Sequence, residues 1–101
     1  MIWIKIGVKI GNTHPVLWKC IKYVEKTMGD VYITSGDEGL HMPTSFHYLG
    51  RALDFSRNNK TKKDIRKAVD EYCQIYGIHK QDFDLIEYDK GNFFHLEYDP
   101  K

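Results

Sequence analysis

The feature that most constrains the fold of this 101-residue chain is a pair of six-residue segments near its C-terminus, both rich in aromatic and aliphatic residues. They cover Phe83–Tyr88 and Phe93–Tyr98, and the turn-like tripeptide Asp89-Lys90-Gly91 lies between them. Two such runs around a glycine-containing turn predict a β-hairpin. A hairpin pairs its strands antiparallel, so we expect a mostly antiparallel sheet.

Two other segments repeat apolar residues at the spacing of an α-helix. The first covers His14–Met28, with Pro15 suited to its first turn and Gly29 at its end. The second begins with Thr61 and is ended by Gly77. These start and stop residues predict two main helices.

Three shorter segments have the pattern of β-strands. Residues 2–10 alternate apolar and other side chains, which predicts a half-buried strand or extended arm, and Val31–Thr34 and Arg51–Phe55 are short β-rich runs. Together with the helices and the hairpin, they predict one α+β domain over residues 1–101. In this domain a small, mostly antiparallel sheet is flanked by the two main helices.

The composition narrows the class of protein. With 42% hydrophobic and 29% charged residues the chain is an ordinary globular domain, and no stretch approaches the roughly 18 apolar residues of a membrane helix. The net charge is +1 and the basic run at residues 60–67 is interrupted by an acid, so we interpret that run as a solvated helix face and expect no nucleic-acid partner. We expect Cys20 and Cys73, both on helical apolar stripes, to be buried thiols. The N-terminal segment lacks the pattern of a signal peptide, so we expect synthesis in the cytoplasm.

Two histidines and one aspartate have the residue types of a catalytic metal site. His47 and Asp54 lie seven residues apart around Gly50, and His95 lies on the second strand of the hairpin. Zn²⁺ binds imidazole nitrogen and carboxylate oxygen, and catalytic zinc sites use three protein ligands. Glu97 shares a strand face with His95 and is a candidate acceptor that orients the imidazole. The helical HExxH zinc motif is absent.

Residues 45–54, SFHYLGRALD, resemble the SxHxxGxAxD motif of the D-Ala-D-Ala metallopeptidases, with all five fixed positions present. The resemblance extends to the segments HPVLWKCIKYVEK, ITSGDEGLHMPTS and FFHLEYDP and covers nearly the whole chain. This zinc family includes D,D-carboxypeptidases, D,D-dipeptidases and the L-alanyl-D-glutamate endopeptidases of phage endolysins, and it shares its fold with the Hedgehog signalling domain. The resemblance implies a Hedgehog/DD-peptidase-like fold and Zn²⁺ held by His47, Asp54 and His95.

The resemblance also implies a carboxylate that acts as general base. Many members place an acid three residues before the last ligand, or a histidine two residues before it, where this chain has Asn92 and Phe93. Other members place the acid six residues before the last ligand, which is Asp89 here. Glu87 is the alternative, because alternation along a continued strand puts both carboxylates on one face. We favour Asp89.

Three further residues are candidates for substrate binding. The family commonly uses an arginine upstream of the motif, but residues 34–45 contain none. Arg51, inside the motif, is a candidate for a charge-assisted contact, or for a surface salt bridge. His41 lies on the loop that leads into the motif and is a candidate contact for substrate or for the transition-state oxyanion. Ser45, two residues before His47, is a candidate to orient that metal ligand or to contact substrate; the other interpretation is that it only shapes the turn.

These residues lead to a main hypothesis and an alternative. The main hypothesis is a zinc-dependent metallopeptidase that hydrolyses peptide bonds in peptidoglycan stem peptides, of D,D-carboxypeptidase or L-alanyl-D-glutamate endopeptidase type. The resemblance implies a monomer of phage type that acts on the cell wall, after delivery by the phage or release at lysis, with no membrane partner. The alternative, motivated by Asn92 and Phe93, is a zinc-binding structural or interaction domain of the same fold without hydrolytic activity. A nucleic-acid-binding α+β domain is a third interpretation, based on residues 60–67.

Overall fold

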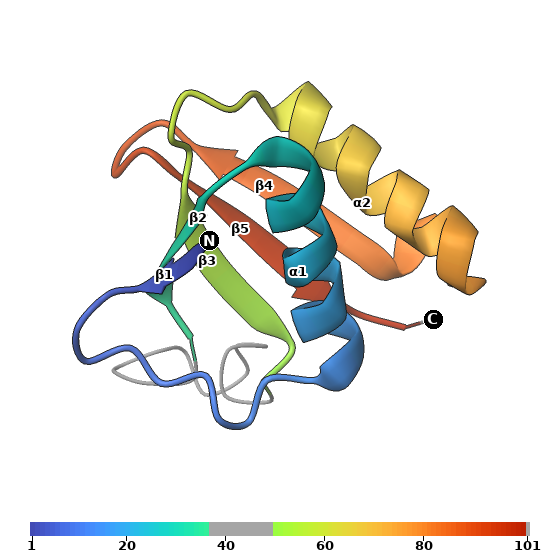
Figure 1. The fold of residues 1–101 in the computed structure, drawn as a ribbon, viewed down its shortest axis with the longest axis horizontal. Helices are drawn as coiled ribbons and strands as arrows, with labels where there is room; N and C mark the ends of the chain where they lie inside the picture. Colours follow the sequence, from blue (N-terminus) through green and yellow to red (C-terminus); the bar gives the residue numbers. More distant parts are fainter. Residues whose placement is uncertain (37–49, 101) are drawn as a thin grey trace.

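In the computed structural model, which describes residues 1–36 and 50–100, a single sheet is covered on one face by two α-helices (Figure 1). The elements of the described residues are β1 (Ile2–Ile4), α1 (Pro15–Met28), β2 (Val31–Ser35), β3 (Ala52–Ser56), α2 (Lys62–Tyr76), the short 3₁₀ helix η1 (Lys80–Asp82), β4 (Phe83–Tyr88) and β5 (Phe93–Tyr98). The strand order is β1-β2-β3-β5-β4, with β1 parallel to β2 and every other pair antiparallel. The prediction of an α+β domain with a mostly antiparallel sheet and two helices is confirmed.

The two helices begin and end at the residues that their sequence signals predict. At the start of α1 the Val16 amide donates to His14 Nδ1 over 3.1 Å, and Pro15 occupies the first turn. At the start of α2 the Thr61 hydroxyl accepts from the Asp64 amide over 3.1 Å, so the predicted capping residue is in place. Gly77 ends α2 in the left-handed conformation, at φ +69°.

The hydrophobic core lies between the helices and the sheet. Alternation along β3 directs Leu53 and Phe55 toward the helices, where each is at most 1% exposed, and directs Asp54 to the opposite face. We call that opposite face, on which the described residues place no helix, the helix-free face. The other core residues are Leu17, Cys20, Ile21 and Val24 of α1, Ile65, Ala68, Val69, Tyr72 and Cys73 of α2, and Val31, Ile33, Phe83, Leu85, Phe94 and Leu96 of the strands. Both cysteines are free and buried, as predicted.

The N-terminal segment differs from its prediction. Only Ile2–Ile4 forms a strand, and the chain then turns at Gly7, which has φ +90°. The Val8 amide donates to the Lys5 carbonyl over 3.0 Å, and the Ile6 side chain is 99% exposed. The prediction of one extended element over residues 2–10 is therefore wrong beyond Ile4, because the turn ends the strand. No helix among the described residues has the length and apolar character needed to cross a membrane.

Candidate metal centre

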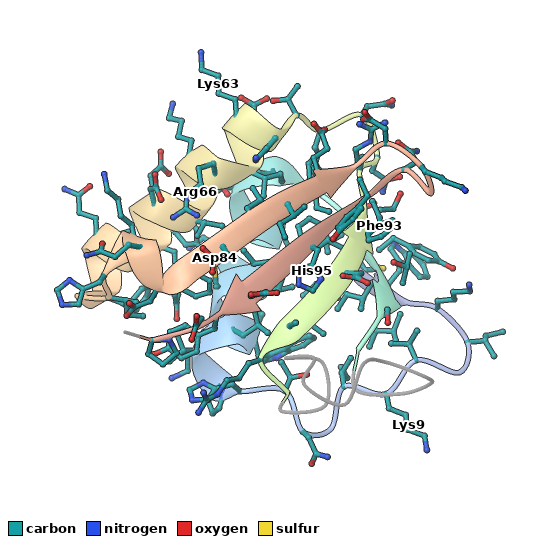
Figure 2. The ribbon with its side chains drawn as sticks, turned by 180° about the vertical axis from the view of Figure 1, so that it is seen from behind. Lys9, Lys63, Arg66, Asp84, Phe93 and His95 are labelled. Atoms are coloured by element: carbon teal, nitrogen blue, oxygen red, sulfur yellow. The ribbon has the colours of Figure 1, made fainter. Side chains whose placement is uncertain are left out.

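Asp54 and His95 meet on the helix-free face of the sheet. They lie in the adjacent strands β3 and β5, where the register pairs them directly. Directly paired residues of antiparallel strands project to the same side, so the two side chains come together although 41 residues separate them in the sequence. His95 Nδ1 lies 2.7 Å from an Asp54 carboxylate oxygen. Figure 2 looks onto this face and labels His95 in the middle of the sheet.

Glu97 contacts the second ring nitrogen of the His95 imidazole. Its carboxylate lies 2.7 Å from His95 Nε2, on the same strand face two residues further along β5. An ionised carboxylate only accepts hydrogen bonds, so this arrangement favours the imidazolium form of His95, in which both ring nitrogens donate. The three side chains are partly shielded from solvent, with exposures of 12% for His95, 15% for Asp54 and 26% for Glu97.

The surroundings of His95 change its acidity. Burial alone would lower the pKa of the imidazolium, but the hydrogen bonds to Asp54 and to Glu97 outweigh burial and raise the pKa above its ordinary value of 6.5. Two carboxylates around one imidazolium leave a net charge of −1 at the cluster. A cation that displaces the Nδ1 proton of His95 would meet two negative charges and a neutral imidazole nitrogen, while Nε2 keeps its proton toward Glu97.

The donor set of this cluster fits Zn²⁺. Zinc binds histidine nitrogen and carboxylate oxygen at about 2.0–2.1 Å, which puts two donors of a tetrahedral ion about 3.3 Å apart. The Asp54–His95 contact of 2.7 Å would widen by only about 0.6 Å to hold such an ion, and the Glu97 contact on Nε2 would leave Nδ1 as the metal-binding nitrogen. Within residues 1–36 and 50–100 no group of three such side chains has metal-binding geometry. The third predicted ligand, His47, lies outside the described residues, as do His41 and Ser45.

The two carboxylates predicted as general base lie elsewhere. Glu87 pairs with the buried Phe94, so it projects to the side of the sheet opposite His95. Asp89 is in the β4–β5 turn and 92% exposed. The Arg57 guanidinium donates to both carboxylates over 3.0 Å, and its Nε donates to the Asn92 side chain over 2.6 Å. The structure therefore brings Glu87 and Asp89 together around Arg57 and does not bring them to the Asp54–His95 pair.

Arg57 is the residue that sequence reasoning missed. It follows β3 directly, and its partners Glu87 and Asp89 lie 30 and 32 residues further along the chain. Its backbone amide also donates to the Asn92 carbonyl over 3.1 Å. Nothing local in the sequence connects an arginine after one strand with a turn between two later strands. Its contacts secure the β4–β5 turn to the end of β3.

The motif glycine and the motif arginine have backbone roles. Gly50 has φ +69°, and a Cβ added there would lie 1.9 Å from the Asn12 carbonyl oxygen. The Gly50 carbonyl accepts from the His14 amide over 2.7 Å, so this glycine allows the chain that enters β3 to touch the start of α1. Arg51 comes next, and its carbonyl accepts from the Tyr98 amide over 2.8 Å, which ties the entrance of β3 to the end of β5.

Comparisons with protein-family models, with curated proteins and with solved structures find no match to this chain. A functional assignment therefore depends on the motif in the sequence and on the arrangement of Asp54, His95 and Glu97.

Proposed function

We propose that this protein is a zinc-dependent metallopeptidase that hydrolyses peptide bonds in the stem peptides of bacterial peptidoglycan. The observation that carries the proposal is the direct pairing of Asp54 with His95 Nδ1 on the helix-free face, with Glu97 on the other ring nitrogen. In the proposal these two residues and His47 hold Zn²⁺. The substrate class comes from the resemblance of residues 45–54 to the D-Ala-D-Ala metallopeptidase motif.

The residues of the chain have separate parts in this proposal. When bound, Zn²⁺ polarises the scissile carbonyl and lowers the pKa of a water molecule. Asp54 supplies a negative oxygen ligand from the centre of β3. Glu97 accepts from His95 Nε2, which fixes the tautomer and directs Nδ1 toward Asp54. Asp54 lies on β3, and His95 and Glu97 lie on the adjacent strand β5, so all three side chains are fixed by paired strands, which keeps the donors rigid.

The test of this proposal is hydrolysis of purified peptidoglycan, followed by mass analysis of the released fragments. We expect peptide fragments from the wild-type protein with zinc, none after chelation, and none from His95→Ala. His79→Ala is the matched control, because His79 is an exposed histidine before η1 and away from the site. Activity that survives chelation, or that survives His95→Ala, would reject the proposed site, and the fragment masses report which bond is cleaved.

A second candidate function is a zinc-binding structural or interaction domain without hydrolytic activity. The observation that favours it is the position of Glu87 and Asp89, whose carboxylates accept hydrogen bonds from Arg57 instead of facing His95. Under this alternative the wild-type protein binds zinc but releases no fragments from peptidoglycan. If fragments do appear, Glu87→Gln and Asp89→Asn tell whether either carboxylate takes part. A fall in kcat by more than about tenfold at unchanged stability would indicate general-base function, and unchanged kcat would assign both to the turn.

A further inference from the structure

An aromatic row crosses the helix-free face beside the Asp54–His95 pair. It consists of Trp3, Tyr32, Ser56, Phe93 and Tyr88, one residue from each strand in spatial order. The register pairs Trp3 with Tyr32, Ser56 with Phe93, and Phe93 with Tyr88. Tyr32 and Ser56 are adjacent too, because the neighbouring residues Ile33 and Phe55 are paired. The row is therefore continuous over the sheet, about 19 Å across at about 4.8 Å per strand.

The row is close to the candidate metal centre and accessible. Phe93 precedes His95 by two residues in β5, and Ser56 follows Asp54 by two in β3, so the row lies about 7 Å along the strands from the Asp54–His95 pair. Figure 2 labels Phe93 and His95 on this same face. Trp3, Tyr32 and Tyr88 are 53%, 39% and 43% exposed, which is high for large aromatic side chains.

We call the centre of the row, between Tyr32 and Phe93, the notch. Ser56 is the single small side chain, and it separates Tyr32 from Phe93 by two strand spacings, about 9.6 Å. Two ring contacts of about 3.5–4.0 Å each need about 7–8 Å, so the spacing of the strands matches one flat or chair-shaped ring placed between Tyr32 and Phe93. On the far side, the Phe93 and Tyr88 rings are stacked at 4.8 Å and 15°, which supports that wall.

The chemistry of the row suits a sugar. A pyranose ring has C–H groups on its faces and hydroxyl groups around its edge. Trp3, Tyr32 and Tyr88 combine an apolar ring with a polar N–H or O–H, and Ser56 adds a hydroxyl at the floor of the notch. The row carries no charged side chain, so a strongly ionic ligand has no partner within it. Its five side chains are also far fewer than the roughly 20–30 residues per partner of a stable protein interface, which disfavours a second copy or another protein.

We propose that the aromatic row binds the glycan strand of peptidoglycan, with one pyranose ring in the notch above Ser56, while the attached stem peptide lies at Asp54 and His95. This inference rests on the proposed function for the identity of the polymer. It adds that the protein recognises the sugar backbone as well as the peptide, and that the intact polymer is preferred over a free stem peptide.

The experiment is calorimetric titration of zinc-free protein with peptidoglycan glycan strands from which the stem peptides have been removed. We expect binding by the wild-type protein that weakens at least about fivefold in Tyr32→Ala, which removes a wall, and in Ser56→Tyr, which fills the notch. Tyr76→Ala is the matched control, because Tyr76 is a 61% exposed tyrosine on α2 and away from the row. It should bind like the wild type. Circular dichroism checks that all three variants are folded.

The outcomes separate this inference from the proposed function. Absence of glycan binding by the wild-type protein, or equal weakening in Tyr76→Ala, would overturn the aromatic row as a binding site even if peptides are hydrolysed. Glycan binding with the expected pattern but no hydrolysis would support the row and reject the enzyme. If both hold, Ser56→Tyr slows cleavage of intact peptidoglycan at least about fivefold and leaves cleavage of a free stem peptide unchanged.

Discussion

Replacement of Gly50 by alanine should destabilise the protein more than the loss of backbone freedom alone explains. Gly50 has φ +69°, and an alanine Cβ there would lie 1.9 Å from the Asn12 carbonyl oxygen, whereas real Cβ contacts essentially never fall under 3.0 Å. The two segments must therefore separate by at least 1.1 Å, the difference between 3.0 and 1.9 Å. Such a shift breaks or strains the 2.7 Å hydrogen bond from the His14 amide to the Gly50 carbonyl, at the start of α1.

The cost has two parts. The left-handed conformation costs a residue with a side chain about 1 kcal/mol relative to glycine. The loss of a hydrogen bond beside the helix start adds about 1–3 kcal/mol. We therefore expect Gly50→Ala to lower the free energy of unfolding by about 3 kcal/mol, which corresponds to a fall in Tm of about 15 °C for a domain of this size.

Gly77→Ala is the matched control for this prediction. Gly77 has the same φ of +69°, but nothing lies within 4 Å of an added Cβ. It should cost only about 1 kcal/mol, a fall in Tm of about 5 °C. Thermal unfolding of both variants, followed by circular dichroism in zinc-free buffer, measures the difference. If Gly50→Ala is no less stable than Gly77→Ala, the close approach between the motif and the start of α1 is wrong.

Three further predictions concern single side chains. Arg57→Ala should lower the free energy of unfolding, measured in urea, by about 1 kcal/mol. The value is small because the partners Glu87 and Asp89 are 32% and 92% exposed. An unchanged urea midpoint would show that Arg57 does not stabilise the β4–β5 turn. Burial raises the pKa of the Cys20 thiol, so a thiol reagent should modify it only in denaturant, and rapid reaction of the folded protein would contradict its position in the core. The pKa of His95 is raised in the folded, metal-free protein, so the protonated imidazole stabilises the fold. This stabilisation is fully present below pH 6.5 and is lost as the pH rises through the pKa of the folded protein. Zinc affinity should therefore fall about tenfold per pH unit below that pKa, and a pH-independent affinity would exclude His95 as a ligand.

The sequence predicted the helices and the hairpin well because their signals are local. The Thr61 cap and the Gly77 stop act within one turn of α2, and the strands of the hairpin are separated by a single short turn. The N-terminal segment shows the limit of this reasoning. Its alternation of apolar residues continues to Ile10. Beyond β1, however, the Lys5 amide donates to the Ile33 carbonyl of β2, and the chain then turns away at Gly7. Alternation of apolar and polar residues does not indicate where the pairing of a strand with a distant strand ends.

In the candidate site, too, the sequence predicted the features that depend on one strand and missed those that depend on how strands pair. Strand alternation predicted that Glu97 shares a face with His95, and the structure has their side chains in contact. Alternation alone left the position of Glu87 open, since the face of a residue depends on where its strand ends and how it pairs. The register of β4 against β5 decides that point, by placing Glu87 beside Phe94. The sequence could not predict the aromatic row either. Its residues come from five strands, and the order and register of those strands are set only when the whole sheet forms.

Metal content tests most directly whether Asp54 and His95 hold a zinc ion. Protein purified and dialysed against zinc-containing buffer should hold about one zinc ion per chain by elemental analysis. His95→Ala and Asp54→Ala should each lose it, while His79→Ala should keep it. Wild-type protein without zinc, or His95→Ala with undiminished zinc, would contradict a zinc site at Asp54 and His95.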